Sequence, residues 1–376
     1  MKICLVGLAF PFRGGIAHYT TMLYRALASR HEVALITLKR QYPGIFFPGT
    51  TQYDHGAESM KVDDTPIIDT LNPFTWLRAG VKIRSFAPDM TLFQWWMPFF
   101  GPSFGSIALF LRLFSRGRIC FLCHNVKPHQ RTPLDRLFSW YGLRFADTFI
   151  VHSDEDMANL LKMRPGVRAR KNPHPTYDFF AADGKPSQPD ARKNLGLDGP
   201  VILFFGFIKP YKGLMDLINA MPEIKKKTGA ILLVVGEFYE DRILYDNAVA
   251  RLGLEDNVRF VDKYVPNNEV PLYFSAADVA VLPYRSATQS GIVQIAFGMG
   301  LPCIVTRVGG LPEVVKDGVT GFTVPPNDPR ALADAVTRFY EENSTQIMKK
   351  NIAEQASQFS WDRIIDVIED LEGVGP

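Results

Sequence analysis

The sequence predicts an α/β protein of two domains, each built around a doubly wound parallel sheet. Short apolar runs, which are typical of parallel strands buried on both faces, alternate with helix-length segments almost throughout the chain. The 376 residues suffice for two domains of ordinary size, and a hydrophobic content of 47% suffices for a full core in each. A proline-rich break at residues 172–198 separates two alternating series, so we expect a linker there, one domain over residues 1–175 and another over residues 190–360.

The first series opens with the uninterrupted apolar strand 3–6, which a glycine-containing turn joins to a helix from about residue 16 to residue 29. Further strands of this domain are expected at residues 32–38, 90–94, 119–123 and 148–152. The second series is expected to form strands at residues 201–205, 230–235, 258–261, 279–282, 303–306 and 322–324. Helices are expected at the end of the chain at residues 329–342, 345–358 and 361–371. Such alternation is typical of doubly wound sheets.

Composition and charge narrow the classes of function. A net charge of +3 is too small to indicate nucleic-acid binding. The first strand follows Met1 and Lys2 directly, so no secretion signal is expected, and no run reaches the roughly 18 apolar residues of a membrane-spanning helix. The four cysteines lie within apolar runs and are expected to be buried thiols of a cytoplasmic protein: Cys4, Cys120, Cys123 and Cys303.

A pair of glycines, Gly14 and Gly15, lies between the first strand and the first helix. Here the backbone must turn and can approach a ligand closely, and the amides of a helix N-terminus attract anions. The alternative is a tight turn without a ligand. The turn does not spell Gly-x-Gly-x-x-Gly, and Leu38, Lys39 and Arg40 close the second strand in place of an acid, so no nicotinamide cofactor is expected.

His124 and Asn125 follow the strand at residues 119–123, at the sheet edge where ligands bind in such folds. An imidazole there can hydrogen-bond a sugar hydroxyl or a reacting oxygen, or it can be structural. Residues 120–124 also match the haem c attachment pattern Cys-x-x-Cys-His. We reject haem, because the pattern lies inside an apolar strand and the chain carries no export signal.

Asp154 and Asp156 form an Asp-x-Asp sequence, which holds a metal in some transferases. Ser153 before them is a good helix N-cap, and acids in a first helical turn stabilise the helix dipole, so we favour the capping interpretation. The histidine, cysteine and carboxylate residues show no convincing metal spacing. We therefore predict neither a metal site nor a bound cofactor.

The stretch from residue 204 to residue 214 is predicted to be a strand, a basic turn and a helix start. It carries Lys209 and Lys212 around a Pro-Tyr pair, and Gly213 follows, which indicates a shaped turn rather than two solvated lysines. Two cations at this place can neutralise the charge that develops on a departing nucleoside diphosphate. We therefore predict a catalytic role for both lysines in an enzyme that uses a nucleotide-activated substrate.

A second helix entry lies later in the same domain. Ser290, Gly291, Ile292 and Val293 lead into a helix that carries no large charge. Its free amides can bind phosphate oxygens, and Gln294, one turn into the helix, can bond ribose hydroxyls.

With these motifs placed, the chain resembles family 4 of the retaining glycosyltransferases, also called glycosyl transferase group 1. The resemblance covers essentially the whole chain and is strongest over residues 201–325. The motifs that fall in family order are Gly206 with Lys212 and Gly213, the turn at residues 290–293, residues 300–302, Gly309 and Gly310 with Glu313, and Asp317 and Gly318 with Gly321. Gly14 and Gly15 match the glycine pair of the family's N-terminal domain, and His124 with Asn125 matches its histidine.

The resemblance implies the GT-B architecture, two facing Rossmann-like domains with parallel sheets and an interdomain cleft. It implies that the last helix, residues 361–376, packs back on the first domain. It further implies a UDP- or GDP-sugar donor held mainly by the second domain, and metal-independent transfer with retention of the sugar configuration. The acceptor expected from the resemblance is a saccharide or lipid-linked saccharide in cell-surface polysaccharide or glycolipid synthesis.

The chain departs from the family pattern in two places. Phe207 stands where the family usually has an arginine, and Lys209 can supply that charge. The usual Glu-x7-Glu, whose glutamates contact the donor sugar and the ribose in the family, is absent from residues 284–294. Either Thr288 or Gln289 is then expected to contact the sugar. The predicted donor-binding residues are Gly14, Gly15, Gly206, Thr288, Gln289, Ser290, Gly291, Ile292, Val293 and Gln294.

Trp95 and Trp96 follow a strand of the first domain, so their rings can line the acceptor site together with Asn125. The apolar helix expected at residues 104–118 ends in arginines and has two interpretations. It can be a core helix, or it can rest in a membrane interface and find a lipid-linked acceptor. The second interpretation predicts a peripheral location at the inner face of the cell membrane.

Two other classes of protein compete with a glycosyltransferase. A sugar-nucleotide epimerase or a phosphorylase of the same fold needs a carboxylate-rich site or a pyridoxal lysine, and neither is evident in the sequence. A non-catalytic module that still binds a sugar nucleotide would account for the missing glutamates. Lys212, His124 and the glycine pair favour an enzyme over such a module.

Overall fold

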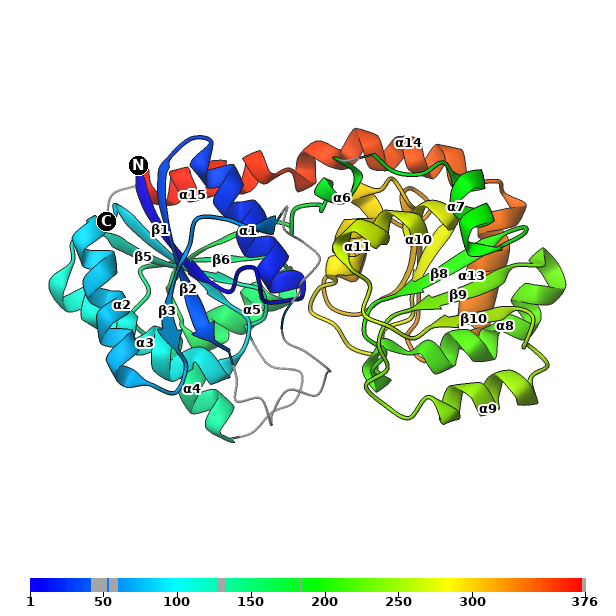
Figure 1. Cartoon of the computed structure of the whole chain (residues 1–376), viewed down its shortest axis with the longest axis horizontal. Coiled ribbons are helices and arrows are strands. Elements are labelled where there is room, and N and C mark those ends of the chain that lie inside the picture. The colour runs from blue at the N-terminus through cyan, green and yellow to red at the C-terminus, as the bar shows by residue number, and fades with distance from the viewer. Residues whose placement is uncertain (42–52, 54–59, 127–132, 183, 374–376) are drawn as a thin grey trace. The chain divides into compact units, whose positions relative to one another are not determined.

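The computed structural model describes residues 1–41, 53, 60–126, 133–182 and 184–373 (Figure 1). The chain divides into two compact units. The first unit comprises Met1–Pro173 and the C-terminal segment that begins at Ser360, and the second comprises His174–Phe359. Each unit contains one sheet of parallel strands, so the predicted fold class of two Rossmann-like domains is confirmed.

The sheet of the first unit has seven strands in the order β3-β2-β1-β4-β5-β6-β7. The five strands that the sequence predicts are β1 (Lys2–Gly7), β2 (Glu32–Arg40), β4 (Met90–Trp95), β5 (Arg118–Cys123) and β6 (Thr148–Val151). The four cysteines are buried and form no disulfide, as expected from their apolar runs.

The sequence does not predict the two edge strands of this sheet, β3 (Thr65–Asp69) and β7 (Arg168–Lys171). An edge strand is not buried on both sides, so it lacks the continuous apolar run that identifies a central parallel strand. β3 contains Pro66, which an edge position tolerates, and β7 reads Arg-Ala-Arg-Lys and is partly exposed along its length.

Helices cover both faces of this sheet (Figure 1). They are α1 (Gly15–Ala28), α2 (Pro73–Phe86), α3 (Gly101–Phe114), α4 (Pro133–Leu143), α5 (Asp154–Met163) and α15 (Trp361–Gly373). Successive strand residues point to opposite faces, so Ile3 and Leu5 pack in one core layer with α1 and α15. Cys4 and Val6 pack in the other layer with α2 and α3.

The C-terminal helix α15 is an integral part of the first unit. Ile364, Ile368 and Leu371 are fully buried in the same core layer as Leu23 of α1. At the surface, Arg30 reaches the carboxylates of α15 and pairs with Asp366 at 2.7 Å. Buried apolar area and surface charge together therefore hold α15 against α1.

The apolar helix expected at residues 104–118 is α3, which runs from Gly101 to Phe114. Most of it is core, because Phe104, Ile107 and Leu111 have at most 1% of their surface exposed. Its last residues differ, since the Leu113 and Phe114 side chains are 65% and 55% exposed. Of the helices in the described ranges, none combines the length and the apolar character that crossing a bilayer requires.

The sheet of the second unit has six strands in the order β10-β9-β8-β11-β12-β13. All six agree with the predicted positions: β8 (Val201–Phe205), β9 (Ile231–Val235), β10 (Val258–Val261), β11 (Val279–Leu282), β12 (Cys303–Thr306) and β13 (Gly321–Val324). The helices are α6 (Phe179–Ala182), α7 (Gln188–Leu195), α8 (Leu214–Thr228), α9 (Ile243–Arg251), α10 (Val270–Ala276), α11 (Gly291–Gly298), α12 (Leu311–Val314), α13 (Pro329–Glu341) and α14 (Thr345–Gln355).

The linker prediction is wrong for the stretch that forms α7. Arg192 pairs with Asp278 at 2.8 Å, and Gln188 Nε2 donates to the carbonyl of Ala277 at 2.9 Å. The prolines that suggested a linker include Pro189, which occupies the first turn of the helix, where its missing N–H costs nothing.

We expect Ile368→Ala to destabilise the first unit by about 2–5 kcal/mol, because the substitution leaves a cavity in a packed core. Arg30→Ala should cost less, since its ion pairs are exposed to solvent. Urea unfolding followed by fluorescence measures both. Ile347→Ala is the matched control, because Ile347 is 64% exposed on α14. Equal losses for Ile368→Ala and Ile347→Ala would show that α15 does not contribute to the core.

Candidate functional site

In each unit, the predicted site residues gather where parallel strands end. In the second unit, chain order reverses between β8 and β11, which are neighbours in the sheet. Right-handed crossovers in opposite directions place the following helices, α8 and α11, on opposite faces. The loops after β8 and β11 therefore diverge and leave the strand ends accessible, which is where ligands bind in doubly wound sheets.

Gly206, Lys212 and Ile292 come together at this point. Gly206 follows β8 with φ of 104°, and a Cβ atom added there would lie 3.0 Å from Lys212 Nζ and 3.4 Å from Ile292 Cδ1. A side chain at position 206 would therefore displace the lysine ammonium from the backbone. The glycine that the family motif contains is required here both by its positive φ and by the closeness of Lys212.

Lys212 is a buried cation at the end of a short 3₁₀ turn, Pro210–Lys212. Only 9% of its surface is exposed, and its ammonium lies 5.3 Å from the ring centroid of Tyr284. Burial lowers the pKa of the Lys212 ammonium. Gly213 makes this turn possible, because its φ is 70° and an added Cβ would lie 2.0 Å from the carbonyl oxygen of Pro283.

Lys209 is half-buried on the same turn, and its ammonium lies 5.0 Å from the ring of Tyr239. Burial lowers the pKa of Lys209, and the positive charge of Lys212 lowers it further. Within the described part of the chain, neither lysine forms an ion pair with a carboxylate. Two partly desolvated cations without a counter-ion favour the binding of an anion between them.

The amino end of α11 lies beside these lysines. Ser290 is the N-cap, and its hydroxyl accepts a hydrogen bond from the amide of Ile292 at 3.2 Å. The Ser290 hydroxyl also lies 3.4 Å from the hydroxyl of Tyr284. The first turn contains no acidic residue, so the dipole of the eight-residue helix is not neutralised at this end.

Two glutamines of this region keep buried polar atoms without partners among the described residues. They are Gln289 Nε2, a donor, and Gln294 Oε1, an acceptor. Gln294 has 1% of its surface exposed, and the backbone carbonyl of the same residue accepts from the amide of Tyr177. A buried polar atom without a partner is costly, so both atoms can take a hydrogen bond from a ligand.

The loop between Gln289 and β11 is fixed by its neighbours. Thr288 is buried, and its carbonyl accepts from the amide of Gly310 at 2.9 Å. Gly309 has φ of 50°, and an added Cβ there would lie 1.8 Å from the carbonyl oxygen of Ala287. Glycines of the Gly-Gly motif thus allow the loop after β12 to pack directly on the loop after β11. Val293 is buried, so its side chain serves packing.

The sequence does not predict one further pair in this site, Asp216 and Arg285. Arg285 Nη2 and Nε lie 2.7 and 2.9 Å from the two carboxylate oxygens of Asp216, which is a bidentate ion pair. Asp216 belongs to the first turn of α8 and Arg285 to the loop after β11, so the pair ties together the two segments that flank Lys212. A bidentate pair resists rotation, and it keeps these segments in register.

In the first unit, the glycine pair lies where the sequence places it. Gly14 is the N-cap of α1 with φ of 109°. Among the described residues, no atom lies within 4 Å of a Cβ atom added to Gly14 or Gly15, so these residues leave the helix end open. The amino end of α1 and the ends of β1 and β4 again lie at the reversal of strand order.

His124 is buried beside the same strand ends. Its Nε2 lies 3.3 Å from Gln94 Oε1, which also lies 3.0 Å from the hydroxyl of Thr20 in α1. The ring packs edge-on against Tyr19 with centroids 4.5 Å apart. The neighbouring His152 has its pKa lowered to about 4 by burial, so it is neutral at physiological pH and Nδ1 donates to the carbonyl of Asn172.

Trp95 does not lie where the sequence predicted an acceptor contact. The ring has no exposed surface, and a side chain on Gly142 would collide with it at 2.6 Å. Trp95 supports the site from the core, and its carbonyl accepts from the amide of His124 at 2.7 Å. Trp96 and Asn125 are half-buried, so an acceptor role remains a prediction for these two residues.

Ser153 caps α5, as the sequence predicted, and accepts from the amide of Asp156 at 3.1 Å. The Asp156 carboxylate in turn accepts from the amide of Val126 at 2.9 Å. Across the residues that the structure describes, no group of histidine, cysteine and carboxylate side chains is arranged to hold a metal ion.

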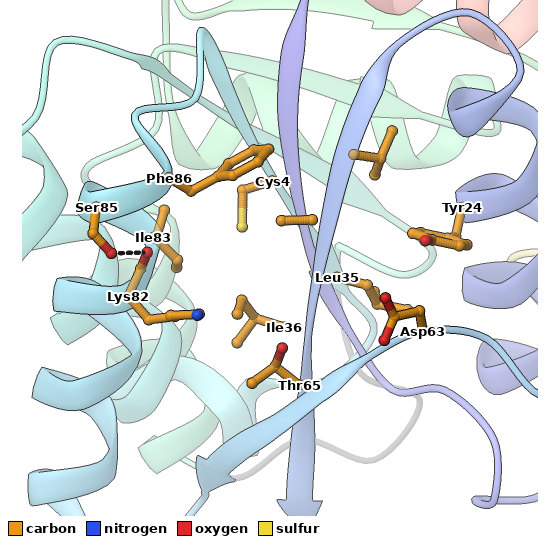
Figure 2. Close-up of a pocket in the computed structure, with 12 residues that line it drawn as sticks. Cys4, Tyr24, Leu35, Ile36, Asp63, Thr65, Lys82, Ile83, Ser85 and Phe86 are labelled. Atoms are coloured by element: carbon orange, nitrogen blue, oxygen red, sulfur yellow. Dashed lines mark hydrogen bonds between the residues drawn. The ribbon is translucent and has the colours of Figure 1, made fainter.

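A pocket of about 420 Å³ lies elsewhere in the first unit, beside β2 and the last turn of α2. Figure 2 shows Lys82 and Ser85 on one side of it and Tyr24 on the other. Its lining includes Cys4, near the amino end of β1, so it lies away from the strand ends that carry the predicted site. The pocket contains no residue of that site.

Comparison with known proteins identifies the class. Residues 199–342 match the family described as Glycosyl transferases group 1. This region includes Lys209, Lys212 and the amino end of α11, and it belongs to that family, which confirms the resemblance drawn from the motifs. The second unit therefore carries a domain of the group 1 glycosyltransferases.

Curated relatives carry related names. The D-inositol 3-phosphate glycosyltransferase of Corynebacterium efficiens is 28% identical over 228 residues, which are 57% of this chain and 54% of that protein. The D-inositol 3-phosphate glycosyltransferase 2 of Catenulispora acidiphila is 32% identical over 232 residues, which are 57% of this chain and 53% of that protein. The chain therefore matches about half the length of these relatives.

Solved structures resemble the chain over its whole length. Sucrose-phosphate synthase from Thermosynechococcus elongatus has a TM-score of 0.73 at 23% identity and covers 98% of both chains. The Anabaena protein Alr3699/HepE in complex with UDP has a TM-score of 0.75 at 19% identity and covers 100% of both chains. At these identities the likeness shows the fold, which is GT-B with two Rossmann-like domains.

We expect Lys212→Met to weaken binding of a nucleoside diphosphate about 10- to 100-fold, since a hydrogen bond to a charged group contributes about 1.5–3 kcal/mol. The unliganded variant should be at least as stable as the wild type, because a buried cation without a counter-ion is replaced by an apolar chain of similar length. Calorimetric titration and thermal unfolding measure the two effects. Lys226→Met on the exposed face of α8 is the control. Unchanged affinity in Lys212→Met would exclude the ammonium from the site.

The lowered pKa values of Lys209 and Lys212 predict a pH dependence. As pH rises through these values each ammonium loses its charge, so nucleoside diphosphate affinity should fall at a lower pH than an ordinary lysine would give. In Lys209→Arg the side chain at position 209 stays charged over the whole pH range. Affinity should then decline less steeply with pH, because only Lys212 loses its charge. Affinity measured from neutral pH to about pH 10 tests this. Superimposable profiles for wild type and variant would contradict a role for the Lys209 charge.

Proposed function

We propose that the protein is a retaining, metal-independent hexosyltransferase that moves a sugar from a UDP- or GDP-sugar to a saccharide or lipid-linked saccharide. The acceptor would belong to cell-surface polysaccharide or glycolipid synthesis. The observation that carries this proposal is the pair of partly desolvated cations, Lys209 and Lys212, beside the amino end of α11. Cations and free helix amides at one point fit the diphosphate of an activated sugar.

In this proposal the lysines act mainly on the leaving group. As the bond between the sugar and the diphosphate breaks, negative charge builds on the departing phosphate oxygen, and a nearby ammonium stabilises that charge. Because Lys212 is already desolvated and held by the turn at Gly213, little reorganisation is needed during the reaction. The two cations and the helix amides offer the positive charge that a metal ion supplies in other transferases.

The ribose and the sugar of the donor can hydrogen-bond the two buried glutamines, Gln289 and Gln294. Gln294 Oε1 can accept from a ribose hydroxyl, and Gln289 Nε2 can donate to a hydroxyl oxygen of the sugar. These amides replace the glutamates that the family usually has, and they carry no charge of their own. The Anabaena protein Alr3699/HepE, which shares the fold, was solved in complex with UDP, and this supports a nucleotide as part of the donor.

The first unit would supply the acceptor side. His124 is held by Gln94 next to the open amino end of α1, so its imidazole can orient an acceptor hydroxyl or a donor sugar hydroxyl. The half-buried Trp96 and Asn125 are the further candidates for acceptor contact. We include in the proposal a cytoplasmic location with peripheral contact at the inner face of the cell membrane, where a lipid-linked acceptor would be found.

A thermal-shift panel of UDP, GDP, ADP, CMP and their common sugar conjugates tests the donor. We expect a rise in unfolding temperature with one nucleoside diphosphate family, because a ligand that binds only the folded state stabilises it. Mass spectrometry of reactions with the selected sugar nucleotide and an acceptor extract should then show sugar transfer that Lys212→Met strongly reduces.

Each other outcome has a distinct meaning. A flat panel would contradict a donor site in this chain. Conversion of a bound sugar nucleotide to its epimer would identify the protein as an epimerase. Binding of a sugar nucleotide without turnover in any acceptor extract would identify it as a non-catalytic module.

A further inference from the structure

The helix layer formed by α2, α3 and α4 carries an unusual number of exposed apolar side chains. Among the described residues, fifteen large apolar side chains are exposed, and eight of them lie on these three helices. They are Phe74, Leu77, Val81, Leu113, Phe114, Leu134, Leu137 and Trp140. Single exposed apolar residues need no explanation, but a gathering on adjacent helices indicates an interaction surface.

On α2 the exposed apolar residues form a stripe. Phe74, Leu77 and Val81 are spaced i, i+3 and i+7, so they share one face of the helix, and their exposed fractions are 83%, 54% and 52%. The opposite face packs in the core through Ala79 and Ile83. This helix therefore has apolar residues toward the core and a second apolar stripe toward the surface, which burial inside the unit does not account for.

On α4 a comparable stripe contains Leu134, Leu137 and Trp140, with exposed fractions of 59%, 53% and 44%. The guanidinium of Arg144 stacks on the Trp140 ring at 4.7 Å from its centroid. A tryptophan paired with a cation is typical of side chains at a boundary between apolar and aqueous phases.

The three helices form one continuous layer, because glycines bring them into close contact. A side chain on Gly80 of α2 would collide with Phe110 of α3 at 2.6 Å, and a side chain on Gly105 of α3 would collide with Tyr141 of α4 at 2.7 Å. Figure 1 shows the three helices together on the first sheet. The stripes of α2 and α4 therefore flank α3, and α3 adds Leu113 and Phe114 at its end.

The charge of this surface favours an anionic partner. α2 contains three cations and no acidic residue: Arg78, Lys82 and Arg84. Beyond the end of α3, a separate cavity of about 440 Å³ at the amino ends of β5, β6 and β7 is also basic, since four arginines and one acid line it: Arg112, Arg116, Arg118, Arg168 and Asp147. Two copies of such a surface would repel each other, so a second copy of this chain does not fit the charge.

We propose that the α2–α4 face docks on the surface of an anionic phospholipid bilayer. The apolar stripes would enter the region between headgroups and acyl chains, and the cations would bind the phosphates of the headgroups. This deepens the peripheral contact included in the proposed function by assigning its surface. It does not depend on sugar transfer, because vesicle binding can be measured without donor or acceptor.

Co-sedimentation with vesicles tests the apolar part. The whole protein should sediment with vesicles of phosphatidylcholine mixed with phosphatidylglycerol, and much less with phosphatidylcholine alone. Phe74→Ser with Leu77→Ser should lower the partition coefficient about tenfold or more, since two large apolar groups are lost from the interface. The matched control is Ile243→Ser with Leu244→Ser, because these residues of α9 are 62% and 55% exposed in the second unit.

A second pair of variants tests the charge. Arg78→Gln with Arg84→Gln should lower partition on the anionic vesicles about tenfold and weaken its sensitivity to salt. The matched control is Lys193→Gln with Lys226→Gln, which removes two exposed cations from the second unit. Unchanged thermal unfolding in all four variants would exclude misfolding as the cause of any loss.

Three results would overturn the proposal. The first is a wild-type protein that does not sediment with anionic vesicles at low salt. The second is equal loss of partition in the stripe variants and the α9 control. The third is a wild-type dimer in solution that the Phe74→Ser, Leu77→Ser variant converts to a monomer, which would assign the face to self-association instead.

Discussion

The reversal of chain order at the centre of each sheet is the constraint on which the sites depend. In both units the first strand in sequence has neighbours that the chain reaches by crossovers in opposite directions, so the helices that follow lie on opposite faces. The strand ends between them remain open, and loops of different origin meet there. In the second unit this brings Lys212 against Gly206 and the amino end of α11. In the first it places Gly14 and His124 near the same sheet edge.

Burial of Lys209 and Lys212 is expected to lower the folding stability of the second unit. A desolvated ammonium without a carboxylate partner is unfavourable in the free protein, as the lowered pKa of Lys212 shows. Asp216 would be the obvious counter-ion nearby, yet it is held by Arg285 in a bidentate pair. The pair fixes the loops around Lys212, and it engages both carboxylate oxygens of Asp216 with Arg285.

The sequence predicted those elements whose position in the fold leaves a pattern in the neighbouring residues. The central strands, buried on both faces, carry apolar runs, and Gly206, Lys212 and Ser290 stand at turns whose geometry follows from their neighbours in sequence. It failed where the reason lies in the fold. The edge strands β3 and β7 have no apolar run, the core position of Trp95 depends on Gly142, and the Asp216–Arg285 pair joins residues 69 positions apart. The sequence shows that residue 294 is a glutamine, but only the fold shows that its Oε1 is buried without a partner among the described residues.

The α2–α4 face extends the same argument from the site to the surface. A helix between sheet and solvent normally needs one apolar stripe, and the exposed face carries polar residues. α3 follows this rule until its last turn, whereas α2 and α4 carry a second stripe outward. Exposed apolar groups favour association and reduce solubility, so cations among them favour an anionic surface over unspecific contact. Of the two interpretations of residues 104–118, the core interpretation holds for most of α3, and membrane contact stays a proposal for its exposed end at Leu113 and Phe114.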